Sequence, residues 1–220
     1  MSGRIVARYD YTNSKGDLRL RKLRFDPKGF LMRSWDSDRE KWRNGVSDER
    51  QRFWMLALYK LPELVAALRV DVPAWWCEGE KDAETLLRLG LTATTTPNPS
   101  ELWDDQCRWF TKFRSQSEVM LVLDNDLHGG WWGWERYTGL LRLGVAPDRI
   151  HVLAPPYRFN DVTDMVEAGR SPSDMRRVDL ARLEKAAHAY TAARARSYTR
   201  RRTSLGPSGW QREVVKRGAS

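Results

Sequence analysis

The first part of the chain alternates between apolar and polar side chains with the two-residue period of half-buried β-strands. The alternating segments lie at 4–12, 18–26 and 30–35, with polar turns at 13–17 and 26–29. Short turns between such segments are typical of antiparallel strands. The pattern therefore predicts a small antiparallel sheet, and the charged stretch 36–52 that follows it is expected to be a loop.

Beyond residue 56, short apolar runs alternate with amphipathic stretches, which is typical of parallel βαβ units. The expected strands are 74–78, 91–96, 119–124 and 150–154. The expected helices are a short one that ends at 68 and others at 81–89, 100–113, 133–143, 161–168 and 173–197, with Ser100 as a helix cap. The pattern predicts an α/β domain followed by a long C-terminal helix.

A chain of 220 residues can hold one large domain or two small ones. We expect a β-rich basic subdomain over 1–70, an α/β domain over 71–170, and a helix with a basic tail over 171–220. Two cysteines, Cys77 and Cys107, are too few for a disulfide framework or a four-ligand zinc site. The sequence has no signal-peptide pattern and no long apolar run, so we expect a cytoplasmic protein without a membrane partner.

The net charge of +9 and the pI of about 9.8 favour an anionic partner, with nucleic acid first. The alternative is a soluble protein that happens to be basic. Near the C-terminus, three consecutive arginines suit phosphate contacts: Arg200, Arg201 and Arg202. A solvated chain end is also compatible with such a run.

Carboxylates follow two of the expected strands: Glu78 ends the first, while Asp124 and Asp126 end the third. Carboxylates that meet repel one another unless a cation lies between them. Oxygen ligands favour Mg²⁺ or Mn²⁺ over zinc, and such ions can bridge phosphate oxygens and activate a hydroxyl. The alternative is that Asp124 and Asp126 are helix caps or turn residues.

Aromatic side chains follow these acids directly. His128 could contact phosphate or metal, but a loop histidine with no second histidine nearby more often does neither. Trp131, Trp132 and Trp134 could stack on bases or pack against the sheet. We expect two of the three tryptophans to pack.

Two motifs in order, Glu-Gly-Glu-Lys-Asp at 78–82 and Asp-Asn-Asp-x-x-Gly at 124–129, resemble the toprim (topoisomerase–primase) domain. The resemblance is strongest to the primase branch of phage and plasmid replication proteins. It covers roughly 73–169 and, more weakly, 4–68. It implies a toprim-type, mostly parallel sheet flanked by helices and preceded by a small β-rich basic subdomain.

The resemblance also implies roles for individual acids. Glu78 takes the place of a metal ligand or general acid/base of nucleotidyl transfer, and Asp124 and Asp126 take the place of catalytic metal ligands. The full set of implied metal ligands is Glu78, Asp82, Asp124, Asp126, Asp161 and Asp164. The family segment that Asp161 and Asp164 resemble carries lysine where this chain has Asn160. Gly129 matches a family glycine that lets the backbone approach phosphate.

Basic residues complete the implied site. The run Arg-Phe-Asp-Pro-Lys-Gly-Phe at 24–30 is similar to a strand segment ahead of primase toprim domains. It suggests that Arg24, Lys28 and Arg33 line a groove for template or nucleotide phosphates, the alternative being a solvated sheet face. Lys81 could meet a nucleotide phosphate or be an exposed helix lysine.

The resemblance implies a primase-type DNA-directed RNA polymerase that makes RNA primers on single-stranded DNA from nucleoside triphosphates, with Mg²⁺ or Mn²⁺ and with a replicative helicase as a candidate partner. One alternative is a metal-dependent toprim nuclease that uses the same acids. Another is a non-catalytic nucleic-acid-binding replication accessory. The sequence has no zinc-ribbon cysteines and no Gly-x-x-x-x-Gly-Lys-Thr motif, so we expect a lone catalytic core, a partner-dependent piece or a diverged relative.

Overall fold

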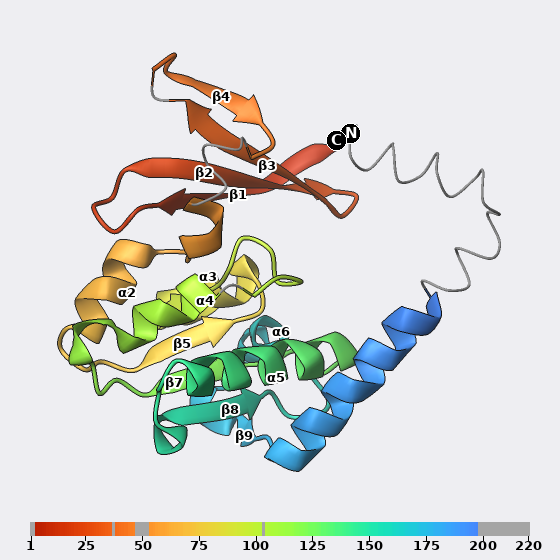
Figure 1. The fold of residues 1–220 in the computed structure, drawn as a ribbon. Coiled ribbons are helices and arrows are strands. Elements are labelled where there is room, and N and C mark those ends of the chain that lie inside the picture. The colour runs from red at the N-terminus through yellow and green to blue at the C-terminus, as the bar shows by residue number, and fades with distance from the viewer. Residues whose placement is uncertain (1–2, 37, 47–52, 103, 198–220) are drawn as a thin grey trace.

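The computed structural model describes residues 3–36, 38–46, 53–102 and 104–197, which form two sheets with helices around the second (Figure 1). The first sheet is antiparallel in the order β1-β2-β3-β4. Its strands are β1 (Arg4–Thr12), β2 (Leu18–Asp26), β3 (Gly29–Asp36) and β4 (Lys41–Asn44). The three predicted strands and the turns between them are confirmed.

The fourth strand corrects the expectation of a loop after residue 36. β4 pairs with the end of β3, so that Trp42 lies opposite Trp35 with ring centroids 5.3 Å apart. The guanidinium of Arg21 lies 4.5 Å from the Trp42 ring centroid. The sequence pattern does not indicate this strand because charged residues flank Trp42, whereas aromatic pairing across the sheet is what stabilises it.

The second sheet has the order β6-β5-β7-β8-β9. Its parallel strands are β5 (Ala74–Cys77), β6 (Thr92–Thr94), β7 (Val119–Val122) and β8 (Ile150–Ala154), and β9 (Arg176–Arg177) is antiparallel at the edge. Because parallel strands end at one common edge, whatever follows β5 and β7 in the chain is brought together there.

The helices cover this sheet (Figure 1). They are α2 (Leu61–Leu68), α3 (Glu80–Arg88), α4 (Asp104–Cys107), α5 (Leu127–Arg142), α6 (Val162–Glu167) and a long helix at 180–197, with short turns of helix at 53–56, η1 (Arg108–Arg114), η2 (Pro147–Arg149) and η3 (Pro172–Asp174). Among the described helices, none is both long and apolar enough to span a bilayer.

Three helix predictions need correction. The stretch predicted as one helix from Ser100 is the short α4 followed by η1, and the Ser100 N–H donates to the Asn98 side chain in a turn. α5 begins at Leu127, six residues before the predicted start, because Asp126 caps it there. The sequence pattern missed this first part because its glycines have poor helix propensity. The last helix begins at 180, after η3 and β9 have formed.

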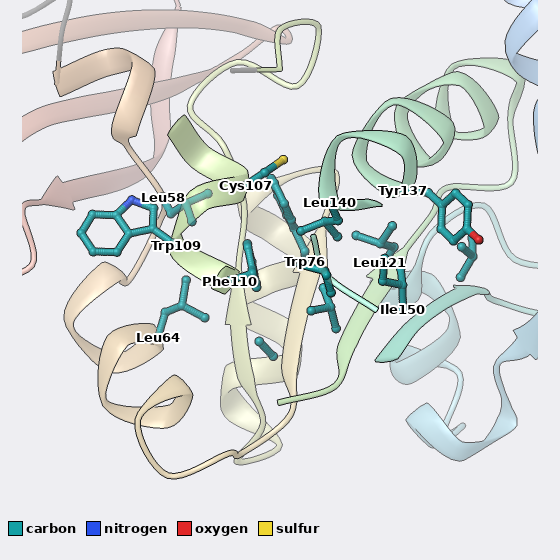
Figure 2. Close-up of a cluster of buried hydrophobic side chains, with 14 of the residues drawn as sticks. Leu58, Leu64, Trp76, Cys107, Trp109, Phe110, Leu121, Tyr137, Leu140 and Ile150 are labelled. Carbon is teal, nitrogen blue, oxygen red and sulfur yellow. The ribbon is translucent and has the colours of Figure 1, made fainter. Parts of the chain in front are cut away.

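The core between helices and sheet is rich in aromatic rings (Figure 2). Trp76 from β5 stacks on Phe110 with centroids 4.9 Å apart and meets Trp132 edge to face at 6.4 Å. Trp132 is fully buried, and Trp131 and Trp134 are partly buried and pack against the same cluster, so all three tryptophans pack where two were predicted to. Cys77 is buried, in agreement with its place in a strand.

A buried polar contact joins the two sheets. The Tyr11 hydroxyl on β1 donates to Oε1 of Glu80 at 2.7 Å, and Nζ of Lys22 on β2 lies 2.9 Å from Oε2. All three side chains are buried. A carboxylate out of contact with water is strongly destabilising without such partners, so this contact fixes the first sheet over the start of α3.

Candidate active site

The end of β5 and the end of β7 bring acids to one edge of the second sheet. These strands pair in parallel with Cys77 beside Val122, so Glu78 and Asp124 lie just beyond neighbouring strand ends. Asp126 follows as the N-cap of α5, where its Oδ1 accepts a hydrogen bond of 2.6 Å from the Gly129 N–H. The structure therefore brings together the three acids for which the sequence predicted a catalytic role.

Gly129 explains why this turn is tight. A Cβ at position 129 would lie 2.4 Å from the carbonyl oxygen of Asp124, closer than atoms can approach. The start of α5 thus lies against the backbone of Asp124. The approach of Gly129 to phosphate, which the family resemblance implies, stays a prediction. The glycine holds the two ends of the Asp-Asn-Asp motif against each other.

The acid cluster is electrostatically strained in the absence of a cation. Burial, followed by the charges of Glu78, Asp82, Asp161 and Asp126, raises the pKa of Asp124 to about 9. Oε2 of Glu78 is buried and receives no hydrogen bond from the described residues. An all-oxygen donor set with excess negative charge and an orphaned buried oxygen fits a hard divalent cation.

The other predicted ligands have protein partners. Asp82 is buried, which raises its pKa to about 6, and it accepts hydrogen bonds from the N–H and hydroxyl of Thr163. Asp161 caps α6 by accepting from the Asp164 N–H at 2.7 Å. The contact between Asp82 and Thr163 joins α3 to α6, and the cap by Asp161 fixes the start of α6.

Lys81 is half-exposed and forms ion pairs with two of these acids, Asp161 at 3.4 Å and Asp164 at 3.5 Å. Nearby carboxylates favour its charged form and outweigh burial, so the pKa of Lys81 is raised. The lysine therefore carries a full positive charge at the rim of the acid cluster.

A cleft of about 550 Å³ separates the acids from the first sheet. Its lining comprises Tyr9, Lys22, Arg24, Lys28, Phe30, Met32, Trp54, Glu78, Gly79, Glu80, Lys81, Asp82, Pro97, Asn98, Pro99, Ser100, Asp124 and Asp161. Of the predicted phosphate-binding residues, Arg24, Lys28 and Lys81 line it. One wall is thus acidic and the other basic, which suits a metal-bound polyanion.

Arg33 was predicted to line the same groove, and the structure places it elsewhere. It lies opposite Arg21 in the β2–β3 pair, with its guanidinium 6.0 Å from the Trp42 ring centroid. It is not among the cleft residues. Arg33 therefore lies outside this cleft, because its position on β3 directs its side chain towards the aromatic pair with β4, and a contact between Arg33 and phosphate stays a prediction.

The predicted phosphate-binding arginines of the tail cannot be placed relative to the cleft. Arg200, Arg201 and Arg202 lie outside the described residues, which end at 197. Their contact with phosphate stays a prediction from the sequence. The basic residues that the structure does bring to the acids come from the first sheet and from α3.

Sequence reasoning gave little weight to one member of the cluster. His128, in the first turn of α5, has its Nδ1 2.6 Å from Oε1 of Glu78. Single ligand atoms of Glu78, Asp126 and His128 all lie within 4.8 Å of one another. The signal in the sequence was its position two residues after Asp126, close to the strand end that carries the acids.

The N-cap contact leads to a prediction for stability without metal. We expect Asp126→Ala to lower the free energy of unfolding by about 1 kcal/mol, because the Gly129 N–H loses its acceptor. Asp126→Asn keeps an acceptor oxygen and should lose less than half of that. Urea denaturation in EDTA measures both variants, and equal losses for Ala and Asn would show that charge, not capping, is what Asp126 contributes to the metal-free fold.

The strands, the acids at their ends and the flanking helices define a toprim-type α/β fold, preceded by a small β-rich basic sheet and followed by a C-terminal helix. The solved structures that this chain resembles include DNA primase domains. Searches with the sequence find no matching family model and no matching curated protein.

The RNA polymerase domain of Mycobacterium tuberculosis primase superposes with a TM-score of 0.53 and 15% identity, over 74% of this chain and 51% of that one. The zinc-binding and RNA polymerase domains of Aquifex aeolicus primase give 0.53 and 17%, over 82% and 39%. A DNA primase domain from Pseudomonas aeruginosa gives 0.51 and 19%, over 76% and 48%. The chain thus spans about half, or less, of these three structures, and the likeness establishes the fold.

Proposed function

We propose that this chain is a primase-like nucleotidyltransferase that makes RNA primers on single-stranded DNA during phage or plasmid replication. The observation that carries the proposal is the cleft, which has Glu78 and Asp124 on one wall and Arg24 and Lys28 on the other. The fold shared with primase RNA polymerase domains supports it. A polymerase needs such opposite walls because it must hold a metal-bound triphosphate against a negatively charged template.

Each wall has a separate task in the proposed reaction. Glu78, Asp124 and Asp126 would hold Mg²⁺ or Mn²⁺, which would neutralise the triphosphate and activate the attacking hydroxyl. Arg24 and Lys28 bind the phosphates of template or nucleotide, and Lys81 provides a further charge at the rim. Asp82, Asp161 and Asp164 would hold α3, Lys81 and α6 in position and complete the proposed set of metal ligands.

A metal-dependent nuclease would use the same acids with water as the attacking group. The position of the first sheet favours synthesis, because its residues form the opposite wall of the cleft and Tyr11 and Lys22 bind Glu80 beside the acids. A non-catalytic nucleic-acid-binding accessory would gain nothing from several carboxylates crowded into one place, because their mutual repulsion destabilises the fold.

One experiment separates these three functions. The protein is incubated with single-stranded DNA, labelled nucleoside triphosphates, and Mg²⁺ or Mn²⁺, with Asp124→Asn alongside. Extension products that disappear in the variant support the primase proposal. Shortened DNA identifies a nuclease, and neither product, with DNA still bound, identifies an accessory. A replicative helicase added to the same reaction tests whether synthesis depends on that partner.

The proposal extends to the organisation of the chain. The basic subdomain 1–70 and the C-terminal segment 171–220 would hold DNA, while 71–170 would carry the catalytic acids. Within the C-terminal segment, Arg200, Arg201 and Arg202 would add phosphate contacts. Deleting residues after 197 and measuring DNA binding tests the contribution of the tail.

Salt dependence gives a prediction for the basic wall. Arg24→Ala and Lys28→Ala should each weaken single-stranded DNA binding and reduce the slope of log K against log salt by about 0.7 for each lost phosphate contact. Arg19→Ala is the matched control, because Arg19 is an odd-numbered residue of β2 whose side chain points to the face opposite Lys22 and Arg24. Fluorescence anisotropy over a series of salt concentrations measures the slopes. Equal slopes for all three variants would place the DNA outside the cleft.

A further inference from the structure

The imidazole of His128 is held in one orientation beside the acid cluster. Its ring lies 5.3 Å from the ring of Trp131 and 5.3 Å from the ring of Tyr190, measured between centroids. Trp131 and Tyr190 are stacked on each other at 5.2 Å. A ring packed against two aromatic neighbours has little rotational freedom, so its Nδ1 stays directed at Glu78.

The helix at 180–197 supplies one of these two neighbours and is packed tightly against α5. A Cβ at Gly130 would lie 2.7 Å from the Cβ of Ala186, so the glycine permits the close approach of the two helices. Leu183 and Ala187 on the same helix are buried. The position of Tyr190, and through it the orientation of the His128 ring, therefore depends on the C-terminal helix.

We propose that His128 is a metal ligand through Nδ1 and that it completes, with Glu78 and Asp126, a mixed nitrogen and oxygen site that selects Mn²⁺ over Mg²⁺. The proposal rests on the proposed function in so far as Glu78 and Asp126 are taken as ligands. Two independent observations carry it: the three ligand atoms lie within 4.8 Å of one another, and the buried Oε2 of Glu78 has no donor among the described residues.

The ligand preferences of the two ions explain why the site should select Mn²⁺ over Mg²⁺. Mg²⁺ requires near-octahedral oxygen coordination and gives up its water reluctantly. Mn²⁺ is the weakest binder of the first-row transition metals and prefers carboxylates, but as a transition-metal ion it accepts an imidazole nitrogen more readily than Mg²⁺ does. Binding at Nδ1 requires that the neutral ring carry its proton on Nε2. In that state His128 and Glu78 would both hold the cation instead of bonding to each other.

Pulsed electron paramagnetic resonance of bound Mn²⁺ tests the ligand directly, because a coordinated imidazole gives a ¹⁴N coupling. The chain has three histidines, His128, His151 and His188, so the double variant His151→Asn/His188→Asn retains His128 alone. We expect the coupling in the wild type and in the double variant, and its loss in His128→Asn. A wild type that binds Mn²⁺ without the coupling, or a His128→Asn variant that retains it, overturns the proposal.

Metal titrations provide the second measurement. His128→Asn should weaken Mn²⁺ binding at least about tenfold, a loss that even an outer partner of a metal ligand can cause. Mg²⁺ binding, measured by competition, should change much less. Equal weakening for both ions would mean that His128 only orients Glu78, and would overturn the proposal. Thermal unfolding of each variant checks the fold, and the wild-type and double-variant spectra decide the ligand even if His128→Asn is unstable.

These measurements do not depend on catalysis. If the protein shows the ¹⁴N coupling but makes no primers on any template, the histidine site is supported and the proposed function is wrong. If the protein makes primers with Mg²⁺ but shows no coupling, the proposed function is supported and His128 is not a metal ligand.

Discussion

Glu78→Gln is expected to reduce primer synthesis by about 100-fold or more while leaving the affinity for single-stranded DNA nearly unchanged. The substitution keeps the size of the side chain but removes the charge that the proposed metal ions require. Packing at the end of β5 should survive, because the Glu78 side chain is only 12% exposed and glutamine fills the same space. In the proposed function the basic wall of the cleft holds DNA, so we expect the affinity not to depend on this carboxylate.

The chain provides a matched control for that experiment. Glu118 also lies beside a histidine, with its Oε1 3.2 Å from Nε2 of His151, but it precedes β7 at the opposite edge of the sheet. Glu118→Gln should synthesise primers at the wild-type rate. Both activities should be measured on the same preparations, and wild-type synthesis by Glu78→Gln would remove this residue from the mechanism.

Asp124→Asn should make the metal-free protein more stable at neutral and alkaline pH, by at least about 1 kcal/mol, the lower end of the cost of an uncompensated buried polar group. The folded protein raises the pKa of this carboxyl from 3.8 to about 9, so ionisation favours the unfolded chain. The contribution of Asp124 to stability is therefore fully present below about pH 4 and is lost as the pH rises towards 9. Asparagine does not ionise, and the difference between the two proteins should grow over this range.

Urea denaturation in EDTA at several pH values measures the effect, with Asp148→Asn in the exposed η2 turn as the control. Adding Mg²⁺ or Mn²⁺ should stabilise the wild type, since a ligand that binds only the folded state shifts the unfolding equilibrium. The variant should gain much less. If Asp124→Asn were less stable than the wild type at pH 8 without metal, a structural role for the carboxylate would be the better account.

The sequence predicted those parts of the fold that depend on local pattern. Alternation identified β1 to β3, because a strand with one buried face has an apolar residue at every second position. Apolar runs identified β5, β7 and β8, because a strand buried on both faces is apolar throughout. The strand at Trp42 and the first turn of α5 were missed. At Trp42, cross-strand contacts stabilise a strand whose composition is polar. At the start of α5, the Asp126 cap outweighs the poor helix propensity of glycine.

The candidate site divides in the same way. Glu78, Asp124 and Asp126 were predicted because each lies just past a strand, and parallel strand ends meet. The sequence could not show that Glu80, two residues from Glu78, is held by Tyr11 and Lys22 of the first sheet. Nor could it show that Tyr190 contacts the ring of His128, since nothing local indicates where the last helix packs.

The contact between Tyr11, Lys22 and Glu80 has a consequence for dissecting this protein into fragments. An expression fragment that begins at the second sheet would still contain Glu80 but would lack both of its donors, and would also expose the aromatic and aliphatic side chains that Tyr9, Tyr11 and Leu20 cover. Such a fragment would be prone to aggregate even with every catalytic acid present. The smallest useful truncation therefore removes residues from the C-terminal end beyond 197. Chimaeras with proteins of the same fold should exchange the first sheet and α3 together.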